Sequence, residues 1–132
     1  MKKLALLFLT ALLGACGTVQ HSGQASLDGE VFYLQRMALP PTATLSVSLH
    51  DVSKADAPVH VLARQSGPTD GQVPLPFHLN YDPKQVRADH RYMVSARIEL
   101  DGKLLFISTH RHDVTLDGQD QQPLRIRVDS VQ

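Results

Sequence analysis

The sequence predicts an all-β domain, built as a small antiparallel β-sandwich of seven to eight strands. Apolar and polar residues alternate in several short runs, and no window after residue 26 sustains the 3.6-residue apolar spacing of an amphipathic helix. Gly, Pro and Asp residues that are typical of turns separate these runs at short intervals. The 132 residues allow one such domain or little more, and a small barrel has the same sequence signature.

Three runs show the alternation most clearly, at residues 44–49, 92–100 and 124–129, and each places its apolar residues on one face of a strand. Five further strands are expected where the alternation is shorter or less regular. Their ranges are 30–37, 59–65, 73–81, 103–109 and 111–116.

Two of the boundaries carry geometric information. Asp101 and Gly102 separate two alternating runs, and they predict a hairpin with a type I′ turn because both residues tolerate positive φ. Pro74 and Pro76 lie two apart in one expected strand, so both remove a backbone donor from the same side of it. This strand is therefore expected at a sheet edge, with its outer side blocked against foreign strands.

The first residues predict export and attachment to a membrane. Lys2 and Lys3 precede an uncharged run at 4–13, which is typical of a secretory signal and too short to span a hydrocarbon core about 30 Å thick. Residues 13–16 (LGAC) resemble the bacterial lipobox, in which the cysteine receives diacylglycerol before cleavage. Cys16 is thus the expected lipid attachment site, with palmitate-type chains as the anchor. The alternatives are an ordinary signal peptide with a chance Cys and a buried N-terminal helix.

These observations divide the chain into three parts. Residues 1–15 are expected to form a lipoprotein signal peptide, residues 16–26 a lipidated flexible tether, and residues 27–132 the β-sandwich domain. By resemblance to Gram-negative lipoproteins, Gly17 after the cysteine indicates the periplasmic face of the outer membrane, while retention in the inner membrane stays open.

The charge balance argues against nucleic acid as a partner. Subtracting Lys2 and Lys3 from 13 leaves 11 Lys+Arg in the part after residue 15, against 13 Asp+Glu, a net charge near −2. Such a chain has no basic footprint for nucleic acid, and general electrostatic adhesion to anionic lipid is not its expected anchor.

No residue is singled out as catalytic, cofactor-binding or metal-binding. The chain carries no G-x-S-x-G elbow, phosphate-binding Gly-rich loop or H-E-x-x-H motif. His110 and His112 can share one face of a strand, but the sequence specifies no third ligand, so no metal is expected. The segment from Asp51 to Asp56 has oxygen donors, yet it lacks the Gly and Glu of a calcium loop and contains Lys54. A turn held by Asp and Ser side chains is expected there.

Two arginines near the C-terminus and the three tyrosines each have two interpretations. Arg125 and Arg127 share the polar face of one strand and can bind an anion or an acidic partner, although such arginines usually serve solubility. Tyr33, Tyr81 and Tyr92 are expected in the core or at its rim and not as a stacking platform.

Residues 29–129 resemble the YbaY/YscW-like family of small Gram-negative lipoproteins. The resemblance rests on the elements ALPP, D-V-S-x-A-D-A-P and P-F-x-L-x-Y-D within residues 33–58, 71–83 and 91–109. It implies a β-sandwich behind a lipidated N-terminus. Family members in type III secretion resemble pilotins, lipoproteins that escort an outer-membrane secretin or chaperone its assembly, but no partner-contacting motif is identified in this chain.

The expected function is a non-enzymatic binding or chaperone-like, pilotin-like role at the periplasmic face of the outer membrane, with an outer-membrane or periplasmic protein as partner and no cofactor. Two alternatives stay open. An envelope-glycan or small-ligand binding module requires an aromatic cavity built from Phe32, Phe77, Phe106 and the tyrosines. A periplasmic metal-binding protein requires the histidines to converge.

Overall fold

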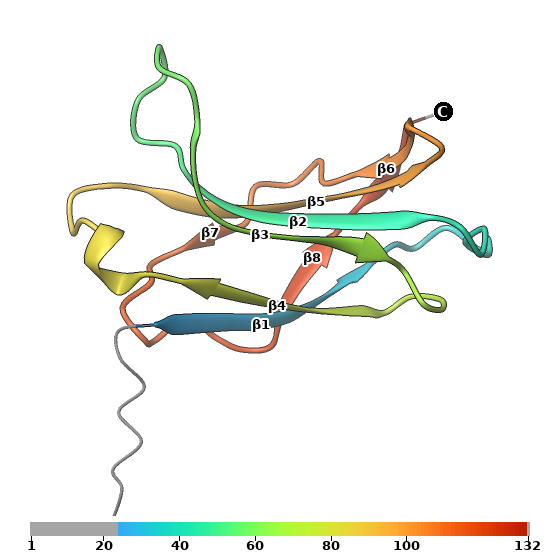
Figure 1. Cartoon of the computed structure of the whole chain (residues 1–132), viewed down its shortest axis with the longest axis horizontal. Coiled ribbons are helices and arrows are strands. Elements are labelled where there is room, and N and C mark those ends of the chain that lie inside the picture. Colours follow the sequence, from blue (N-terminus) through green and yellow to red (C-terminus); the bar gives the residue numbers. More distant parts are fainter. Residues whose placement is uncertain (1–23, 132) are drawn as a thin grey trace, which may run out of the picture.

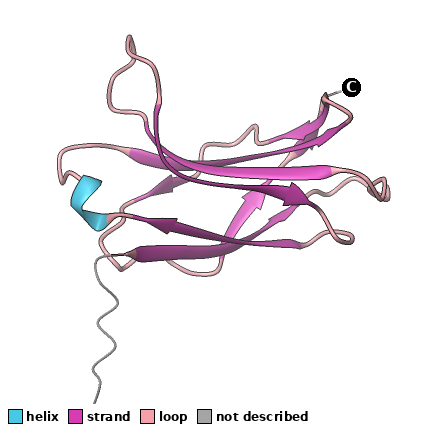
Figure 2. Ribbon diagram, viewed as in Figure 1, coloured by secondary structure: helices cyan, strands magenta, loops and turns pink. Residues whose placement is uncertain are grey.

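Two β-sheets face each other across a shared apolar core in a computed structural model that describes residues 24–131 (Figure 1, Figure 2). The smaller sheet has the strand order β4-β1-β8, and the larger has the order β3-β2-β5-β6-β9, with β7 paired to β5. The strands are β1 (Ala25–Phe32), β2 (Thr44–Asp51), β3 (His60–Pro68), β4 (Leu75–Tyr81), β5 (Tyr92–Leu100), β6 (Lys103–Ile107), β7 (Asp113–Val114), β8 (Leu124–Arg127) and β9 (Asp129–Ser130). The predicted β-sandwich is confirmed, with nine described strands where seven to eight were expected.

The predictions for residues 1–23 lie outside the described residues: the signal peptide, lipid attachment at Cys16 and most of the tether. Within the described part, the helical element is the short 3₁₀ helix η1 (Pro83–Gln85). No helix in residues 24–131 is long and apolar enough to cross a membrane.

The core follows from the alternation seen in the sequence. In β2, Leu45, Val47 and Leu49 are at most 5% exposed, while the residues between them are only partly buried. In β5, Ile98 is fully buried and Arg97 is exposed. The predicted register of both strands is therefore confirmed, and the serines between the apolar residues of β2 lie on the outer face.

β1 starts at Ala25, before the expected start of the folded domain at residue 27. The tether prediction is thus wrong for Ala25 and Ser26, which pair with the end of β4. Gly29 explains the error. It occupies an inward-facing position, and a Cβ built there meets the Phe77 ring at 2.4 Å, so the opposite strand fills the place of its side chain. An inward glycine gives no apolar signal in the sequence.

Three strands end earlier than their expected ranges. β1 leaves the sheet after Phe32, β6 stops at Ile107, and β7 has two residues. Beyond β6, the Thr109 hydroxyl donates to the Asp129 carboxylate. The segment also keeps two backbone hydrogen bonds to β5, from the Ser108 N–H to the Ala96 oxygen and from the Val94 N–H to the His112 oxygen, although it is not a continuous strand.

β4 is an edge strand of its sheet, as predicted, but it starts at Leu75, so Pro76 lies in it and Pro74 precedes it. The His78 backbone N–H points away from β1, because it donates to the Gln65 side-chain oxygen at 2.7 Å. Backbone donors two residues apart face the same side of a strand, so Pro76 removes one from this outer edge. The next donor on this edge, the His78 N–H, is bonded to the side chain of Gln65, which belongs to β3 in the other sheet.

The tight turn between β5 and β6 also matches its prediction. Asp101 and Gly102 have φ values of 50° and 79°, and Leu100 pairs with Lys103 across the turn. Two positive φ values at the central positions are the signature of a type I′ hairpin.

One part of the topology departs from a purely antiparallel sandwich. β8 pairs with β1 in parallel, and after Val128 the chain crosses to the larger sheet, where β9 pairs with β6. The Val128 N–H donates to the Phe32 carbonyl oxygen at 2.9 Å, at the point where the chain changes sheets. A strand that serves both sheets holds them together along one side.

Candidate functional site

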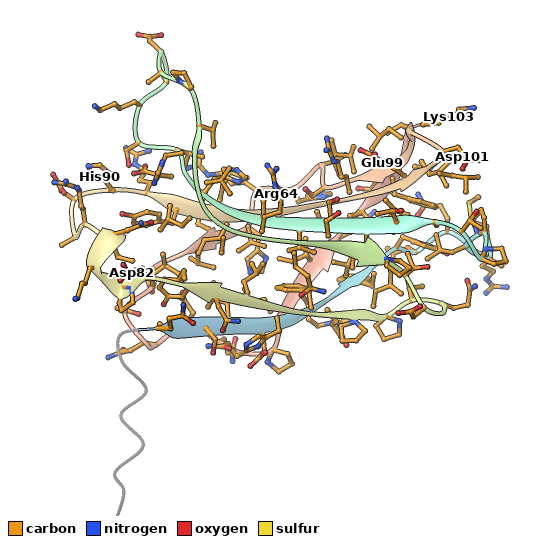
Figure 3. All side chains as sticks on the ribbon, in the orientation of Figure 1. Arg64, Asp82, His90, Glu99, Asp101 and Lys103 are labelled. Atoms are coloured by element: carbon orange, nitrogen blue, oxygen red, sulfur yellow. The ribbon has the colours of Figure 1, made fainter. Side chains whose placement is uncertain are left out.

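A cleft with a basic lining opens at the end of the sandwich where β1 begins. It lies between the loop that joins β2 to β3 and the segment that joins β4 to β5, on the side of Figure 3 where His90 and Asp82 are labelled. Its volume is about 520 Å³. The polar and charged side chains that line it are Asp51, Lys54, His60, Lys84, Gln85, Arg87 and His90.

Asp51 ties the two walls of this cleft together. One carboxylate oxygen accepts the Ser53 backbone N–H at 2.9 Å, and the other lies 2.5 Å from His90 Nδ1. The Ser53 hydroxyl accepts the Arg91 backbone N–H at 2.7 Å. Partial burial raises the pKa of Asp51, but the hydrogen bonds from Ser53 and His90 outweigh it and bring the pKa to about 2. The predicted turn held by Asp and Ser is confirmed, with a carboxylate that stays ionised at neutral pH.

The cations of the cleft have no such partner. Lys54, Lys84 and Arg87 are exposed and form no ion pair with any residue in 24–131. Asp51 is the carboxylate among the lining residues, and it is engaged by His90 and Ser53. Three permanent positive charges thus face a hollow whose negative charge is already paired.

Among residues 24–131, no Ser, Thr or Cys side chain is hydrogen-bonded to His90, so the His90–Asp51 pair has no nucleophile beside it there. The second ring nitrogen of His90, Nε2, lies 4.0 Å from the Asp89 carboxylate. A base that activates a hydroxyl needs that hydroxyl within hydrogen-bond reach, about 2.6–3.2 Å. His90 instead lies between two carboxylates, and its contact with Asp51 joins two loops.

A second hollow, which we call the serine groove, lies on the outer face of the larger sheet and has a volume of about 490 Å³. Its floor consists of serines that are cross-strand neighbours. The Ser46 and Ser66 hydroxyls are 3.0 Å apart, and those of Ser48 and Ser95 are 3.2 Å apart. The floor is low because serine side chains are small. Each of these hydroxyls has another hydroxyl as its hydrogen-bond partner.

Larger side chains border the serine groove. Met93 and Ile107 supply apolar surface, and Arg64 and Arg97 supply positive charge. Arg97 lies 2.9 Å from Glu99, whereas Arg64 forms no ion pair with a described residue. Burial, and then the Arg64 charge, lower the pKa of His50, the next outward residue of β2. Arg64 is labelled at the middle of the sheet in Figure 3.

The structure separates the histidines that the sequence raised as metal ligands. His110 Nδ1 lies 3.8 Å from the Asp129 carboxylate, while His112 lines a different hollow beside Asp113 and Asp120. Residues 24–131 contain no group of three or more His, Cys, Asp or Glu placed to hold a metal ion.

The arginines and tyrosines of the sequence interpretation also have defined places. The Arg125 guanidinium lies 4.4 Å above the Phe32 ring and pairs with Glu30, while Arg127 pairs with Asp129. Both arginines are thus engaged on their own face of the sheet. The core or rim position predicted for the tyrosines is confirmed: Tyr33, Tyr81 and Tyr92 are each at most 6% exposed.

A comparison with protein families finds a match over residues 22–126 to the model described as type III secretion system lipoprotein chaperone (YscW). The chain belongs to this family. The matched range contains all of β1 to β7, the cleft and the serine groove. The resemblance found in the sequence is thereby confirmed.

Two relatives agree with this assignment. The uncharacterized lipoprotein YbaY of Escherichia coli (strain K12) is 43% identical over 104 residues, which are 78% of this chain and 55% of that protein. The chain therefore spans about half the length of this curated relative. Among solved structures, an alternative pilotin from the type II secretion system of Vibrio cholerae is 45% identical, with a TM-score of 0.77 over 83% of this chain and 98% of that one.

Sequence reasoning did not find either hollow as a site. The serine groove was visible in part, because Ser46, Ser48 and Ser95 occupy the outward positions of two predicted strands. The basic cleft combines Lys54 with Lys84, from segments that only the fold brings together. No spacing rule within one segment indicates it.

Proposed function

We propose that this chain is a lipoprotein anchored through Cys16 at the periplasmic face of the outer membrane, where it binds an outer-membrane or periplasmic protein in a non-enzymatic, pilotin-like role. The likeness to the Vibrio cholerae pilotin carries the proposal, since it extends over 98% of that chain at 45% identity. The match to a lipoprotein chaperone family supports the same role.

The serine groove is the surface that we propose for the partner. Its satisfied hydroxyls carry no desolvation penalty of the kind that unpaired buried groups impose, and Met93 and Ile107 offer apolar contact beside them. Arg64, which has no ion pair among residues 24–131, favours a partner segment that carries a carboxylate. The expected occupant is therefore a segment of a partner protein with apolar and acidic side chains.

Cross-linking in intact envelopes, followed by capture of this chain and mass spectrometry, tests the partner. We expect an outer-membrane or periplasmic protein whose recovery falls in the Ser95→Phe variant, because the larger side chain fills the floor of the serine groove. Ser26→Phe is the matched control, since Ser26 lies on an exposed position of β1 in the other sheet. Equal losses in the two variants, or none in either, would contradict the assignment of the partner to this groove.

Metabolic labelling with palmitate tests the anchor. The parent chain is expected to incorporate label and to sediment with outer-membrane fractions, while Cys16→Ala incorporates none and is released. Because the lipid raises the effective concentration of a membrane partner, recovery of that partner should also fall in Cys16→Ala. Label in the Cys16→Ala variant would exclude this residue as the attachment site.

A further inference from the structure

We propose that the basic cleft beside the Asp51–His90 contact is a binding site for the phosphate of an anionic phospholipid headgroup. The inference uses the lipid anchor of the proposed function to choose among phosphate sources, but it does not depend on the protein partner. It concerns one discrete site and not the general charge of the chain, which is near −2 after residue 15.

The chemistry of the lining residues fits a phosphate. Arg87 offers a planar fork of donors that can contact two phosphate oxygens, while Lys54 and Lys84 offer compact positive charges. The Gln85 amide adds a neutral donor suited to the glycerol hydroxyls of a headgroup. None of these three cations has an ion pair among the described residues, so an incoming anion displaces no existing partner.

The Asp51–His90 contact fixes the shape of the cleft. It joins the end of β2 to the segment before β5, 39 residues apart in the chain, and thereby holds the two cationic walls at a fixed separation. The resulting volume of about 520 Å³ lies within the roughly 300–1,000 Å³ range of small-molecule sites.

The position of the cleft favours a membrane as the source of the phosphate. Ala25, the first residue of β1, pairs with Tyr81, and Lys84 follows only three residues later in η1. The eight residues 17–24 that separate Cys16 from β1 reach at most about 29 Å when fully extended. The start of β1 and η1 lie at the same end of the sandwich (Figure 1). A lipid on Cys16 thus keeps this end within that reach of the headgroups.

Nearby carboxylates restrict the attraction to the cleft itself. The Asp82 carboxylate accepts the Lys84 backbone N–H at 2.9 Å, and those of Asp117 and Asp120 accept hydrogen bonds from Thr115. Asp56 and Asp89 also lie on the two segments that form the walls. With both signs of charge at this end, a broad electrostatic adhesion to lipid is not expected. The cleft itself is still lined by three cations and one carboxylate, that of Asp51, which is bonded to Ser53 and His90.

The test is a titration of the ¹⁵N-labelled full chain in a neutral maltoside detergent with three probes. The probes are dihexanoyl phosphatidylglycerol, dihexanoyl phosphatidylcholine and inorganic phosphate. We expect saturable amide shifts at Gln85, Arg87 and His90 with phosphatidylglycerol, at lower concentration than with inorganic phosphate, and none of comparable size with phosphatidylcholine. Salt should weaken the binding, because the cations are exposed.

Charge-removal variants assign these shifts to the cleft. Lys84→Gln and Arg87→Gln should each weaken phosphatidylglycerol binding by about three- to fivefold, the effect of one partly exposed charge. Lys103→Gln, which removes the same charge at the far end of the sandwich, should leave it unchanged (Figure 3).

Four results would overturn the proposal. They are an absence of shifts at the cleft, equal weakening in Lys103→Gln, inorganic phosphate binding as tightly as phosphatidylglycerol, and a polyglutamate peptide that shifts the cleft at lower concentration than the lipid. Because the titration takes place in detergent and uses no partner protein, its outcome is independent of both palmitate labelling and cross-linking.

Discussion

At the scale of single residues, Asp51 has more structural effect than its place in a loop-forming motif suggests. Its two oxygens bond to different segments, one within its own turn and one to His90, 39 residues away. Its side chain is only 15% exposed, so these contacts are partly shielded from solvent. A short D-V-S element in the sequence thus fixes the relative position of the two loops that form the basic cleft.

The pH dependence of stability tests the importance of Asp51. Its folded pKa of about 2 lies below the ordinary value of 3.8, so it stabilises the fold above about pH 4, and this contribution disappears as the pH falls toward 2. Asp51→Asn should lower the free energy of unfolding at pH 7 by about 2 kcal/mol, and the difference from the parent should shrink to about 0.4 kcal/mol near pH 2. Urea unfolding at the two pH values measures both.

Asp89→Asn serves as the control for this prediction. The Asp89 side chain is 87% exposed and lies 4.0 Å from His90, so its removal should change stability little at either pH. A constant difference between Asp51→Asn and the parent from pH 7 to pH 2 would show that the ionised carboxylate is not the stabilising species.

At the scale of elements, the smaller sheet depends on one close approach. Gly29 in β1 lies between the Phe77 ring of β4 and the Leu124 carbonyl oxygen of β8, which a Cβ would meet at 2.4 and 2.6 Å. The carbonyl belongs to the backbone and cannot rotate away. The missing side chain of Gly29 therefore allows three strands to pack with an aromatic ring over the central one.

Substitution of Gly29 should accordingly destabilise the fold. Gly29→Ala is expected to cost about 1–3 kcal/mol, the usual effect of excess volume in a packed core. Gly67→Ala is the matched control in β3, because a Cβ there has no heavy atom within 4 Å. Urea midpoints that shift equally in the two variants would mean that glycine content, and not the contact with Phe77, limits stability.

The alternation of β5 makes a second prediction at this scale. Ile98→Asp places a carboxylate at a position with 0% exposure and should cost several kcal/mol, a large part of the roughly 5–15 kcal/mol stability of a typical domain. Arg97→Ser changes the exposed neighbour and removes only a surface ion pair to Glu99, so it should cost at most about 1 kcal/mol. Thermal unfolding of the two variants compares them, and equal shifts would contradict the observed register.

At the scale of the whole molecule, the sequence predicted the parts of the fold that depend on local periodicity. β2, β5 and β8 follow alternating runs, and the edge position of β4 follows from its prolines. The first half of β1 escaped prediction because Gly29 interrupts its apolar face. The basic cleft escaped prediction because its charges come from segments that are distant in the sequence. The serine groove escaped because outward serines look in the sequence like those of any solvated strand face.

β1 starts at Ala25, and truncation tests whether the folding unit begins there. A chain that begins at Gln24 keeps every described strand, so its free energy of unfolding should match that of a chain beginning at residue 17. A chain that begins at Gly29 loses Leu27, which is 2% exposed. It also loses the backbone pairing of residues 25–28 with β4. Burial of a leucine alone contributes about 1.5–3 kcal/mol, so this shorter chain should be destabilised by more than that amount or fail to fold. Urea unfolding followed by circular dichroism distinguishes the outcomes. Equal stability of the two truncated chains would show that the first half of β1 is dispensable, and failure of the chain from Gln24 would place part of the folding unit before it.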